Sequence, residues 1–530
     1  MSMFRFTNIL TRCNTTRTSN TSAILIRRSI NLGNEPYNAP AIATKATAEQ
    51  EETVKPFDAI PTRNSNIWQL IVDLIKLRRK GWFTRPDLMS QENADKYGPI
   101  LRNYLGAGNN YIVEISDPNL VEKVLRAEGK YPERMAIIPW KDYRVTRNIP
   151  LGLFLHDGKE WHRNRQAIGK HILKPAGMSQ YIPAMVDITN DTISRLRRNK
   201  KAEGDRNDIV PDLEEDLFKW SLEGAVKVLL DKRLGLLSEK VDKQSQRFID
   251  AIQDVFITTL DLFIFTNVHK RLNTKPWKRH VEGWDTSIAV TKNLIEDHVN
   301  EMMSAKEKGE QLETNTFLGA LISGSDLTRA EIFGNLSELI GAAIDTTSYT
   351  LVWVLYFLAH NPECQQKLRD EILEVLPESK KITKEDLAKL VYTKMVIKES
   401  MRMVPVISGI TRKLDSDIVL DGYLVPAKTT IAIQFFPMVK NAKTFEEPLK
   451  FRPERWDRTE GNTSHPFASI PFGFGTRMCV GRRFAEQEMH LLLSEIIRQF
   501  DVVPTKTVEM KSKLMIVPAE PIDLKFVDRT

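Results

Sequence analysis

Phe472 to Gly481 read F-G-F-G-T-R-M-C-V-G, a glycine-rich loop that presents Cys479 directly before a helical stretch rich in charged residues. Glycines can turn backbone N–H groups toward a sulfur and let a flat cofactor approach closely. A dinucleotide fingerprint, G-x-G-x-x-G, is excluded because Met478 occupies the third glycine position. For an isolated cysteine, a buried structural thiol is the ordinary alternative. The whole pattern instead favours a thiolate that holds a cofactor metal.

The loop resembles the haem-binding signature F-x-x-G-x-R-x-C-x-G of the cytochrome P450 family at every fixed position: Phe472, Gly475, Arg477, Cys479 and Gly481. The resemblance extends over roughly residues 57–530. It implies a mainly α fold, one large helical domain with a smaller β-rich region. It also implies haem b, with Cys479 as the axial thiolate ligand of the iron.

Composition bounds the class of protein. The 530 residues are 42% hydrophobic and 27% charged, which is ordinary for a soluble globular chain. The three cysteines argue against a disulfide framework and favour a reducing compartment. Zincin, C-x-x-C and P-loop strings are missing from the sequence, so haem has little competition as a cofactor.

The net charge of +7 comes largely from the first 50 residues, which hold six basic and two acidic side chains. Acidic residues are missing up to position 34, while Arg, Ser, Thr and Asn dominate, as in a mitochondrial transit peptide. The alternative is a disordered basic tail. A run of 18 apolar residues is also missing there, so an anchor helix is not expected. Since the positive charge belongs to a leader, the sequence predicts no nucleic-acid partner.

The chain divides into a leader and transit peptide at 1–50, a polar linker at 51–66 and the haem-thiolate domain at 67–530. Helical spacing over 67–80, with a basic end, predicts a helix that packs on a core or lies on a membrane. The apolar run 255–265, followed by a basic stretch with Trp277, predicts a second membrane contact. Residues 199–208 are expected to form a solvated loop.

The longest predicted helix begins at the capping box T-R-A-E, Thr328 to Glu331, and ends at Asn361-Pro362. Later, I-V-L-D-G-Y-L-V at 418–425 predicts a hairpin around Asp421-Gly422, and 429–435 predicts a strand. Helices are therefore expected to outnumber strands.

Asp345 and Thr346 fall in A-A-I-D-T-T, in the middle of the long helix. A buried acid and a hydroxyl beside a cavity can relay protons. The local alternative is that Thr346 bonds to a preceding carbonyl and a neighbouring helix satisfies Asp345. The segment is similar to the oxygen-activating helix of the family, which implies catalytic roles for both residues. Ala343 departs from the usual glycine there.

Other motifs match the family residue by residue. Glu399 and Arg402 in K-E-S-M-R, with Arg455 in F-R-P-E-R-W, resemble its structural Glu-Arg-Arg network. The resemblance assigns haem propionate contacts to Trp161 and Arg165 in W-H-R-N-R, to Arg412 and to Arg477. Arginine suits this role because its guanidinium binds carboxylates as a fork.

Lys394 and Lys398 form a like-charge pair one helical turn apart, and Arg482 and Arg483 follow the cysteine loop. A solvated face is the default interpretation. The resemblance places all four on the thiolate side, where they would steer an acidic electron donor. This matches the mitochondrial branch, which takes electrons from NADPH through a reductase and a [2Fe-2S] ferredoxin. The matrix side of the inner membrane is the expected location.

Within that branch, segments such as Y-P-E-R-M-A-I-I-P-W-K from Tyr131 look most like the vitamin D 24-hydroxylase type, with the sterol 27-hydroxylase type a near relative. The resemblance implies O2-dependent hydroxylation of an apolar, sterol-like or secosteroid-like molecule. The expected substrate pocket comprises Ile138, Trp140, Leu339, Ala342, Val404, Val406 and Ile516. A xenobiotic oxidase, a peroxide-using or isomerase relative and a non-catalytic haem-thiolate binder remain alternatives.

Overall fold

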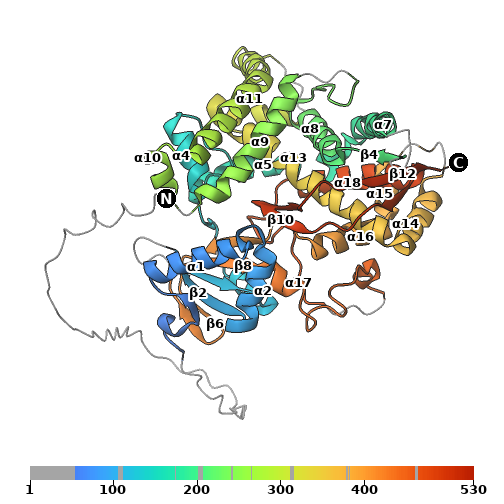
Figure 1. Cartoon of the computed structure of the whole chain (residues 1–530). Helices are drawn as coiled ribbons and strands as arrows, with labels where there is room; N and C mark the ends of the chain where they lie inside the picture. The colour runs from blue at the N-terminus through green and yellow to red at the C-terminus, as the bar shows by residue number, and fades with distance from the viewer. Residues whose placement is uncertain are drawn as a thin grey trace, which may run out of the picture. The chain divides into compact units, whose positions relative to one another are not determined.

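The computed structural model describes residues 54–529 apart from 106–110, 174, 201–206, 240–242, 264, 311–315, 378–379, 381 and 460–463. The predicted leader and most of the predicted loop at 199–208 lie outside the described residues. The remainder forms a helical region and a smaller β-rich region, which Figure 1 shows as separate groups of elements. The predicted mainly α fold is confirmed.

The α-helices are α1 Ile67–Arg79, α2 Pro86–Tyr97, α3 Pro118–Arg126, α4 Ile138–Thr146, α5 Gly158–Ile172, α6 Pro175–Ser179, α7 Ile182–Asn199, α8 Leu213–Leu230, α9 Lys243–Leu262, α10 Thr266–Arg271, α11 Lys275–Glu307, α12 Phe317–Gly324, α13 Arg329–His360, α14 Pro362–Val375, α15 Lys384–Lys389, α16 Val391–Met403, α17 Phe435–Val439 and α18 Arg482–Gln499. Short 3-10 helices are η1 Phe57–Ala59, η2 Trp82–Thr84 and η4 Pro453–Trp456. The strands are β1 Thr62–Asn64, β2 Ile100–Tyr104, β3 Tyr111–Ile115, β4 Ile209–Val210, β5 Gly409–Lys413, β6 Ile418–Leu420, β7 Tyr423–Val425, β8 Thr430–Gln434, β9 Phe500–Pro504, β10 Met510–Lys513, β11 Met515–Pro518 and β12 Leu524–Asp528.

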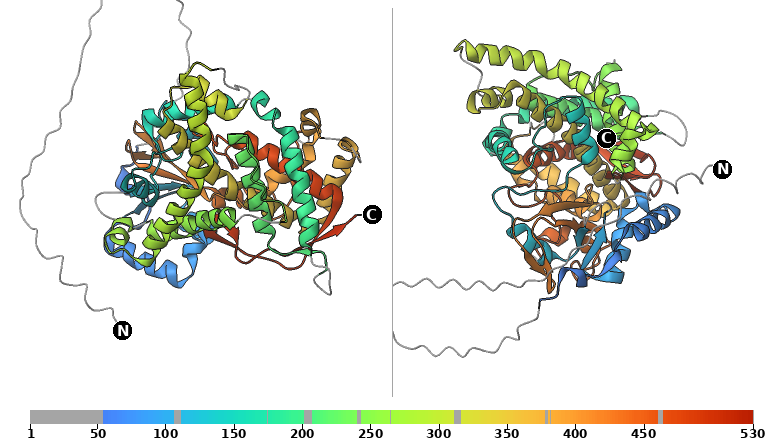
Figure 2. Two further views of the ribbon diagram at one scale, coloured as in Figure 1. Left: turned by 90° about the horizontal axis from the view of Figure 1, so that it is seen from above. Right: turned by 90° about the vertical axis from the view of Figure 1, so that its left-hand side faces the viewer.

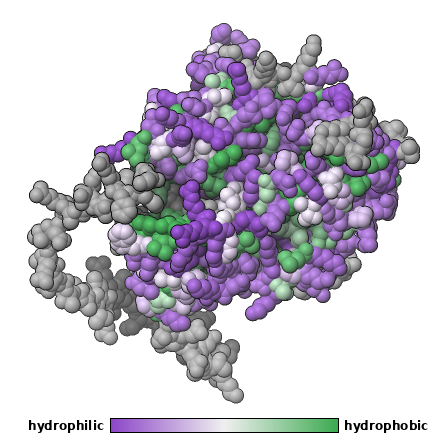
Figure 3. Space-filling model, viewed as in Figure 1, coloured by the Kyte–Doolittle hydropathy of each residue, from purple (hydrophilic) through white to green (hydrophobic). Residues whose placement is uncertain are grey.

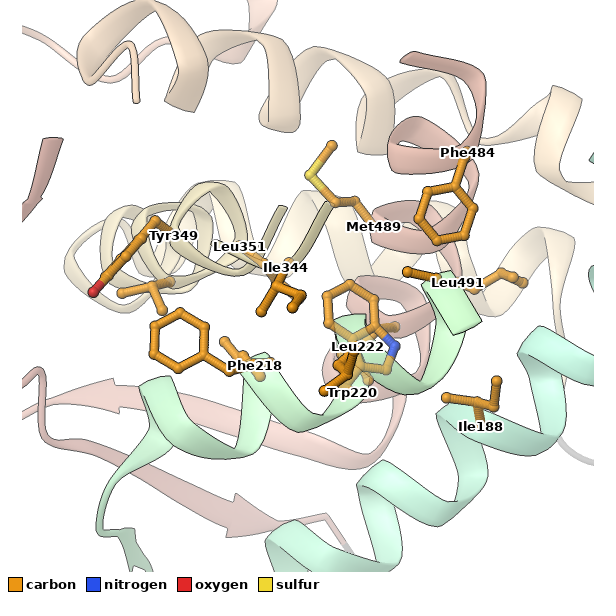
Figure 4. Packing of buried hydrophobic residues seen from close by; sticks show 14 of the residues in the cluster. Ile188, Phe218, Trp220, Leu222, Ile344, Tyr349, Leu351, Phe484, Met489 and Leu491 are labelled. Atoms are coloured by element: carbon orange, nitrogen blue, oxygen red, sulfur yellow. The ribbon is translucent and has the colours of Figure 1, made fainter. Parts of the chain in front are cut away.

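The long helix α13 organises the main core. Thr328 and Glu331 close the predicted capping box, and the helix ends before Pro362 as expected. Apolar side chains of α13, α8 and α18 interdigitate, with Tyr349 edge-on to Phe218 at 5.2 Å between ring centroids (Figure 4). The length and composition of α13 would allow it to cross a membrane, but 78% of its most apolar window is buried in protein. Its apolarity is that of a core helix.

A five-stranded sheet in the order β1-β2-β3-β8-β5 forms the β-rich region, with a separate apolar core beneath it. β8 lies parallel to β3 and antiparallel to β5, so the predicted strand at 429–435 is central to the sheet. β6 and β7 make the predicted hairpin. Positive φ at Asp421 (50°) and Gly422 (77°) matches the primed two-residue turn that suits strand twist.

The structure corrects the prediction that residues 51–66 form a linker. Its described part, from residue 54, belongs to the folded body, because β1 pairs with β2 and Ile60 is buried in the sheet core. Phe57 and Ile60 pack on the apolar core of the sheet. The surrounding residues are polar and include prolines, so the composition of the segment did not indicate this packing.

The predicted helix at 67–80 is α1, and most of its apolar side chains do not pack on the core. Leu70 and Leu77 are buried, whereas Trp68 is 76% exposed, and Ile71, Val72 and Ile75 are exposed beside it. Figure 3 shows the resulting hydrophobic patch where Figure 1 places α1. The basic residues Lys76, Arg78 and Arg79 form the last turn.

The second predicted membrane segment is partly buried. Val255 and Leu262 of α9 are buried, and α9 packs along α11, as the views in Figure 2 also show. Trp277 is buried as well and stacks on His280, so it does not lie at an apolar edge. The exposed apolar residues are Phe265, Val268 and Leu272, in and beside α10.

Candidate haem-thiolate site

The cysteine loop folds tightly around its own backbone. Gly473 and Gly475 have φ of +70° and +75°, a region that residues with a Cβ rarely adopt. The Cys479 N–H donates to the Phe472 carbonyl over 2.8 Å. The backbone N–H groups of Gly481 and Arg482, at the start of α18, donate to the Cys479 sulfur. The loop therefore provides the N–H donors that the glycine pattern predicts.

The surroundings of the Cys479 sulfur combine access to solvent with burial by protein atoms. Water reaches it, yet protein atoms surround it, and this burial raises the pKa of the thiol. The Gly481 and Arg482 N–H groups and the nearby Arg165 guanidinium oppose that rise. At Gly481 an added Cβ would meet no atom within 4 Å. A soft thiolate donor beside open room suits a haem iron, so the residues present fit the implied cofactor.

One face of α13 is accessible in the middle of an otherwise buried helix. Leu339, Ala342, Ala343 and Thr346 follow the i, i+3, i+4, i+7 spacing of a single helical stripe, and none of them is fully buried. Leu339 and Ala343 border the same core cluster as Phe472 and Val480 of the cysteine loop. The stripe and the thiolate loop thus flank one core.

Asp345 lies off that stripe, and only 1% of its surface is exposed. Neither carboxylate oxygen has a hydrogen-bond partner among the described residues. Burial raises the pKa of Asp345 to about 7, and Lys513 of β10 opposes the rise. Thr346 donates its hydroxyl to the Ala342 carbonyl over 2.9 Å. The local alternative therefore forms for Thr346, whereas Asp345 remains an unsatisfied acid.

Glu399, Arg402 and Arg455 form the predicted network in full burial. Arg402 donates to both Glu399 oxygens over 2.9 Å, and Arg455 donates to Oε1 over 2.8 Å. Trp456 Nε1 adds a donor to Oε2 at 2.9 Å, and the Arg452 N–H adds one to Oε1 at 3.0 Å. The remaining arginine donors bind the carbonyls of Val439, Glu446, Glu447, Pro448 and Lys450. One carboxylate thereby ties α16 to the loop chain at 439–456.

The four residues predicted to bind propionates differ in their surroundings, and their shared role stays a prediction. Trp161 is buried with the Arg477 guanidinium 4.4 Å from its ring, and Arg165 lies close enough to Cys479 to influence its pKa. Arg477 pairs with Asp157, and Arg412 pairs with Glu128. Burial lowers the pKa of Arg477 to about 9.

Sequence reasoning missed three members of this charged cluster: Glu128, Asp157 and Arg134. Burial lowers the pKa of Arg134 to about 10, and its guanidinium donates to the Phe154 carbonyl. Gly475 leaves room for Glu128, because a Cβ at that position would stand 2.9 Å from Glu128 Oε2. The signal for Arg134 was present in Y-P-E-R, whereas the two acids match no motif.

Three of the four residues predicted for the basic face, Lys394, Lys398 and Arg482, lie near one another, and Arg458 joins them. Lys394 is exposed, and Lys398 lies electrostatically close to Lys394, Arg458 and Arg482. Arg458 was missed, because it follows the P-E-R-W motif without belonging to a pattern. Arg483 is exposed but donates to the Leu173 carbonyl over 2.6 Å, toward α5 and α6.

The seven predicted pocket residues divide by burial. Leu339 and Ala342 lie on the accessible stripe of α13. Val404, Val406 and Ile516 are buried in the main core, where the Ile516 N–H donates to the Val406 carbonyl over 2.8 Å. The other two are on α4: Ile138 is exposed, and Trp140 is buried in an aromatic cluster with its Nε1 donating to Thr259 Oγ1 over 2.6 Å. Their shared role as a pocket stays a prediction.

A thiolate loop at the start of a helix, a buried Glu-Arg-Arg network and a long core helix with an accessible stripe define a haem-thiolate oxygenase. The chain matches the Cytochrome P450 family over residues 64–526 and belongs to it. It is a cytochrome P450 monooxygenase with a haem-thiolate cofactor.

Similar proteins include the mitochondrial 1,25-dihydroxyvitamin D(3) 24-hydroxylase of Rattus norvegicus, 34% identical, with 95% of this chain and 97% of the relative covered. The mitochondrial sterol 26-hydroxylase of Oryctolagus cuniculus is 34% identical, with 82% of each chain covered. The mitochondrial 25-hydroxyvitamin D-1 alpha hydroxylase of Homo sapiens is 34% identical over 86% of this chain and 91% of its own. The predicted resemblance to the vitamin D 24-hydroxylase and related sterol types is confirmed.

Proposed function

We propose that this protein is a mitochondrial monooxygenase that hydroxylates a sterol-like or secosteroid-like molecule with O2. Electrons come from NADPH through a ferredoxin reductase and a [2Fe-2S] ferredoxin. The observation that carries the chemistry is the Cys479 sulfur, which accepts two backbone N–H groups beside the core to which α13 contributes. The names of the relatives support the substrate class and the mitochondrial location.

Each predicted residue has a defined task in this proposal. Cys479 holds the haem iron, and the bound haem supplies the oxygen-activating chemistry. Arg165, Arg412 and Arg477, with Trp161, bind the propionates, and Arg134 joins them. Asp345 holds a proton in reserve, because its pKa of about 7 keeps much of it protonated near neutral pH. Thr346 lies on the accessible stripe of α13, where its hydroxyl would be available to pass on a proton.

The first test is a screen for the substrate class. The ferric protein is titrated with sterols, secosteroids and planar xenobiotics, and spin-state shifts are recorded. Compounds that shift the spectrum are then offered with NADPH, the reductase and the ferredoxin. We expect secosteroids or sterols to bind and to yield hydroxylated products. Binding of xenobiotics alone would favour the xenobiotic oxidase, and binding without NADPH consumption would favour a non-catalytic binder.

We also propose that the protein is peripheral on the matrix side of the inner mitochondrial membrane. The apolar face of α1 carries an exposed tryptophan followed by a basic last turn. Such a helix lies in a membrane interface, with its cations at the headgroups. Exposed Phe265, Val268 and Leu272 around α10 offer a second contact, on the same side of Figure 1 as α1.

Vesicle flotation tests the membrane contact. We expect the double change Trp68→Ser and Val72→Ser to reduce binding to anionic vesicles at least tenfold, because about 2 kcal/mol or more of apolar burial is lost. Val391→Ser, at an exposed valine on the distant α16, is the matched control and leaves flotation unchanged. Equal flotation of the α1 double variant and the wild type would contradict the proposed contact.

A further inference from the structure

Lys398 is held in an unusual way on the basic face. Its ammonium lies 3.8 Å from the ring centroid of Trp456, within close cation–π range. In the part of the chain that the structure describes, Lys398 makes no ion pair with a carboxylate, and neither do Lys394 and Arg458. Among the described residues, three cations therefore gather without an ion-paired carboxylate, although ion pairs are common elsewhere on this protein.

Trp456 connects this ammonium to the buried network. Its ring carries Lys398 on one face, and its Nε1 donates to Glu399, which also binds Arg402 and Arg455. The polar end of the indole is thus fixed by its hydrogen bond to Glu399, a buried carboxylate that two arginines also hold. A lysine side chain ordinarily loses considerable rotamer freedom when it forms an ion pair. For Lys398, the contact with the Trp456 ring orders much of the side chain before a partner carboxylate binds.

We propose that Trp456 is a positioning residue of the electron-donor face, which presents Lys398 preordered to a carboxylate of the partner, and that docking takes up a proton on Lys398. The inference rests on the proposed ferredoxin-dependent function. The chemistry that fits is an acidic protein surface, because around a fixed ammonium the face presents cations that make no ion pair within the described part of the chain.

The charges around Lys398 explain why docking takes up a proton. The groups that face Lys398 are Arg458 beyond η4, Lys394 and Glu399 on α16, and Arg482 on α18, which is itself paired with Glu486. Burial, followed by the three cations, lowers the pKa of Lys398 to about 8, and Glu399 opposes the shift. A partner carboxylate would raise the pKa again, so binding favours the protonated lysine. By linkage, affinity falls as pH rises through about 8.

The test measures ferredoxin binding to the ferric holoenzyme by calorimetry from pH 7 to pH 9. Two buffers of different ionisation enthalpy are used at each pH. We expect the wild-type Kd to rise about tenfold across this range, with proton uptake near pH 8.5. Lys398→Arg keeps the cation but does not titrate, so its binding should be independent of pH in this range apart from any contribution of the ferredoxin. Lys292→Arg, at an exposed lysine of α11 that pairs with Glu296, is the matched control and retains the wild-type dependence.

Trp456 is tested with two variants. Trp456→Leu removes the ring and should weaken binding at pH 7 about threefold to tenfold, while Trp456→Phe retains the ring and most of the affinity. The same pH dependence in Lys398→Arg as in the wild type would overturn the inference while leaving the electron donor intact. A wild-type enzyme that neither binds nor accepts electrons from ferredoxin at any pH would overturn the proposed donor itself, and the inference with it.

Discussion

Replacing Glu399 with glutamine is expected to give a protein that fails to retain haem. The carboxylate is fully buried and accepts hydrogen bonds from two arginines, one tryptophan and one backbone N–H. Glutamine removes the negative charge and turns an NH2 group toward those donors. Two buried guanidinium groups would then lack a counter-ion, at a cost of about 3–5 kcal/mol. That is a large share of the roughly 5–15 kcal/mol that holds a domain together.

The loss should be seen first in the cofactor. The network ties α16 to residues 439–456, which lead into the cysteine loop, so its failure loosens the support of the thiolate. Haem per polypeptide and the urea midpoint of the purified variant measure both effects. Glu296→Gln is the control, because Glu296 pairs with Lys292 on the surface of α11 and should change stability by under about 0.5 kcal/mol. Stoichiometric haem in the Glu399 variant would contradict a structural role for the network.

Local patterns predicted the elements of this fold well. The capping box at Thr328 and the turn at Asp421-Gly422 determine their structures through hydrogen bonds and φ values of a few neighbouring residues. The haem-thiolate loop is equally local, since its glycines and Cys479 lie within ten residues. The sequence therefore predicted the elements whose structure depends on neighbouring residues. The family resemblance predicted how these elements pack together.

Features that depend on distant partners could not be predicted in this way. The apolar spacing of α1 is the same for a helix on a core and a helix on a membrane, and only its position exposes Trp68. Val404 and Ile516 are predicted pocket residues by resemblance, and both are buried in the main core, so a role in a pocket depends on neighbours that their local sequence does not specify. Glu128 and Lys513 belong to no motif, because their importance comes from the residues that the fold brings beside them.

Replacing Asp345 with asparagine is expected to lower the turnover number about 100-fold or more, within the usual range for the loss of a positioned proton donor. Asparagine has nearly the same shape, but it cannot deliver a proton. In the wild type, the rate should fall as pH rises through about 7, because burial places the pKa there and only the protonated acid is a donor. The variant should lose this pH dependence. A variant that keeps the wild-type rate and profile would remove Asp345 from the proton path.

The same substitution should stabilise the protein at alkaline pH. Unfolded Asp345 has its ordinary pKa near 3.8, whereas the folded value is about 7, so the folded state binds more protons between these values. The free energy of unfolding therefore falls as pH rises through this window, and the full penalty is present above about 7. Asparagine carries no such penalty. Urea unfolding should show the variant gaining about 2 kcal/mol relative to the wild type between pH 5.5 and pH 8.

Glu488→Gln separates the two effects of Asp345. Glu488 of α18 is also buried, and burial raises its pKa well above the ordinary value, although the nearby Ser221 hydroxyl opposes the rise. Its removal should therefore also stabilise the protein as pH rises. Because Glu488 lies beside Gly224, Phe484 and Ser221 and is not itself a residue of the accessible stripe of α13, its turnover should stay near that of the wild type. We expect both variants to gain stability and only the Asp345 variant to lose activity. That result would show that Asp345 lowers the free energy of unfolding but is needed as a proton donor.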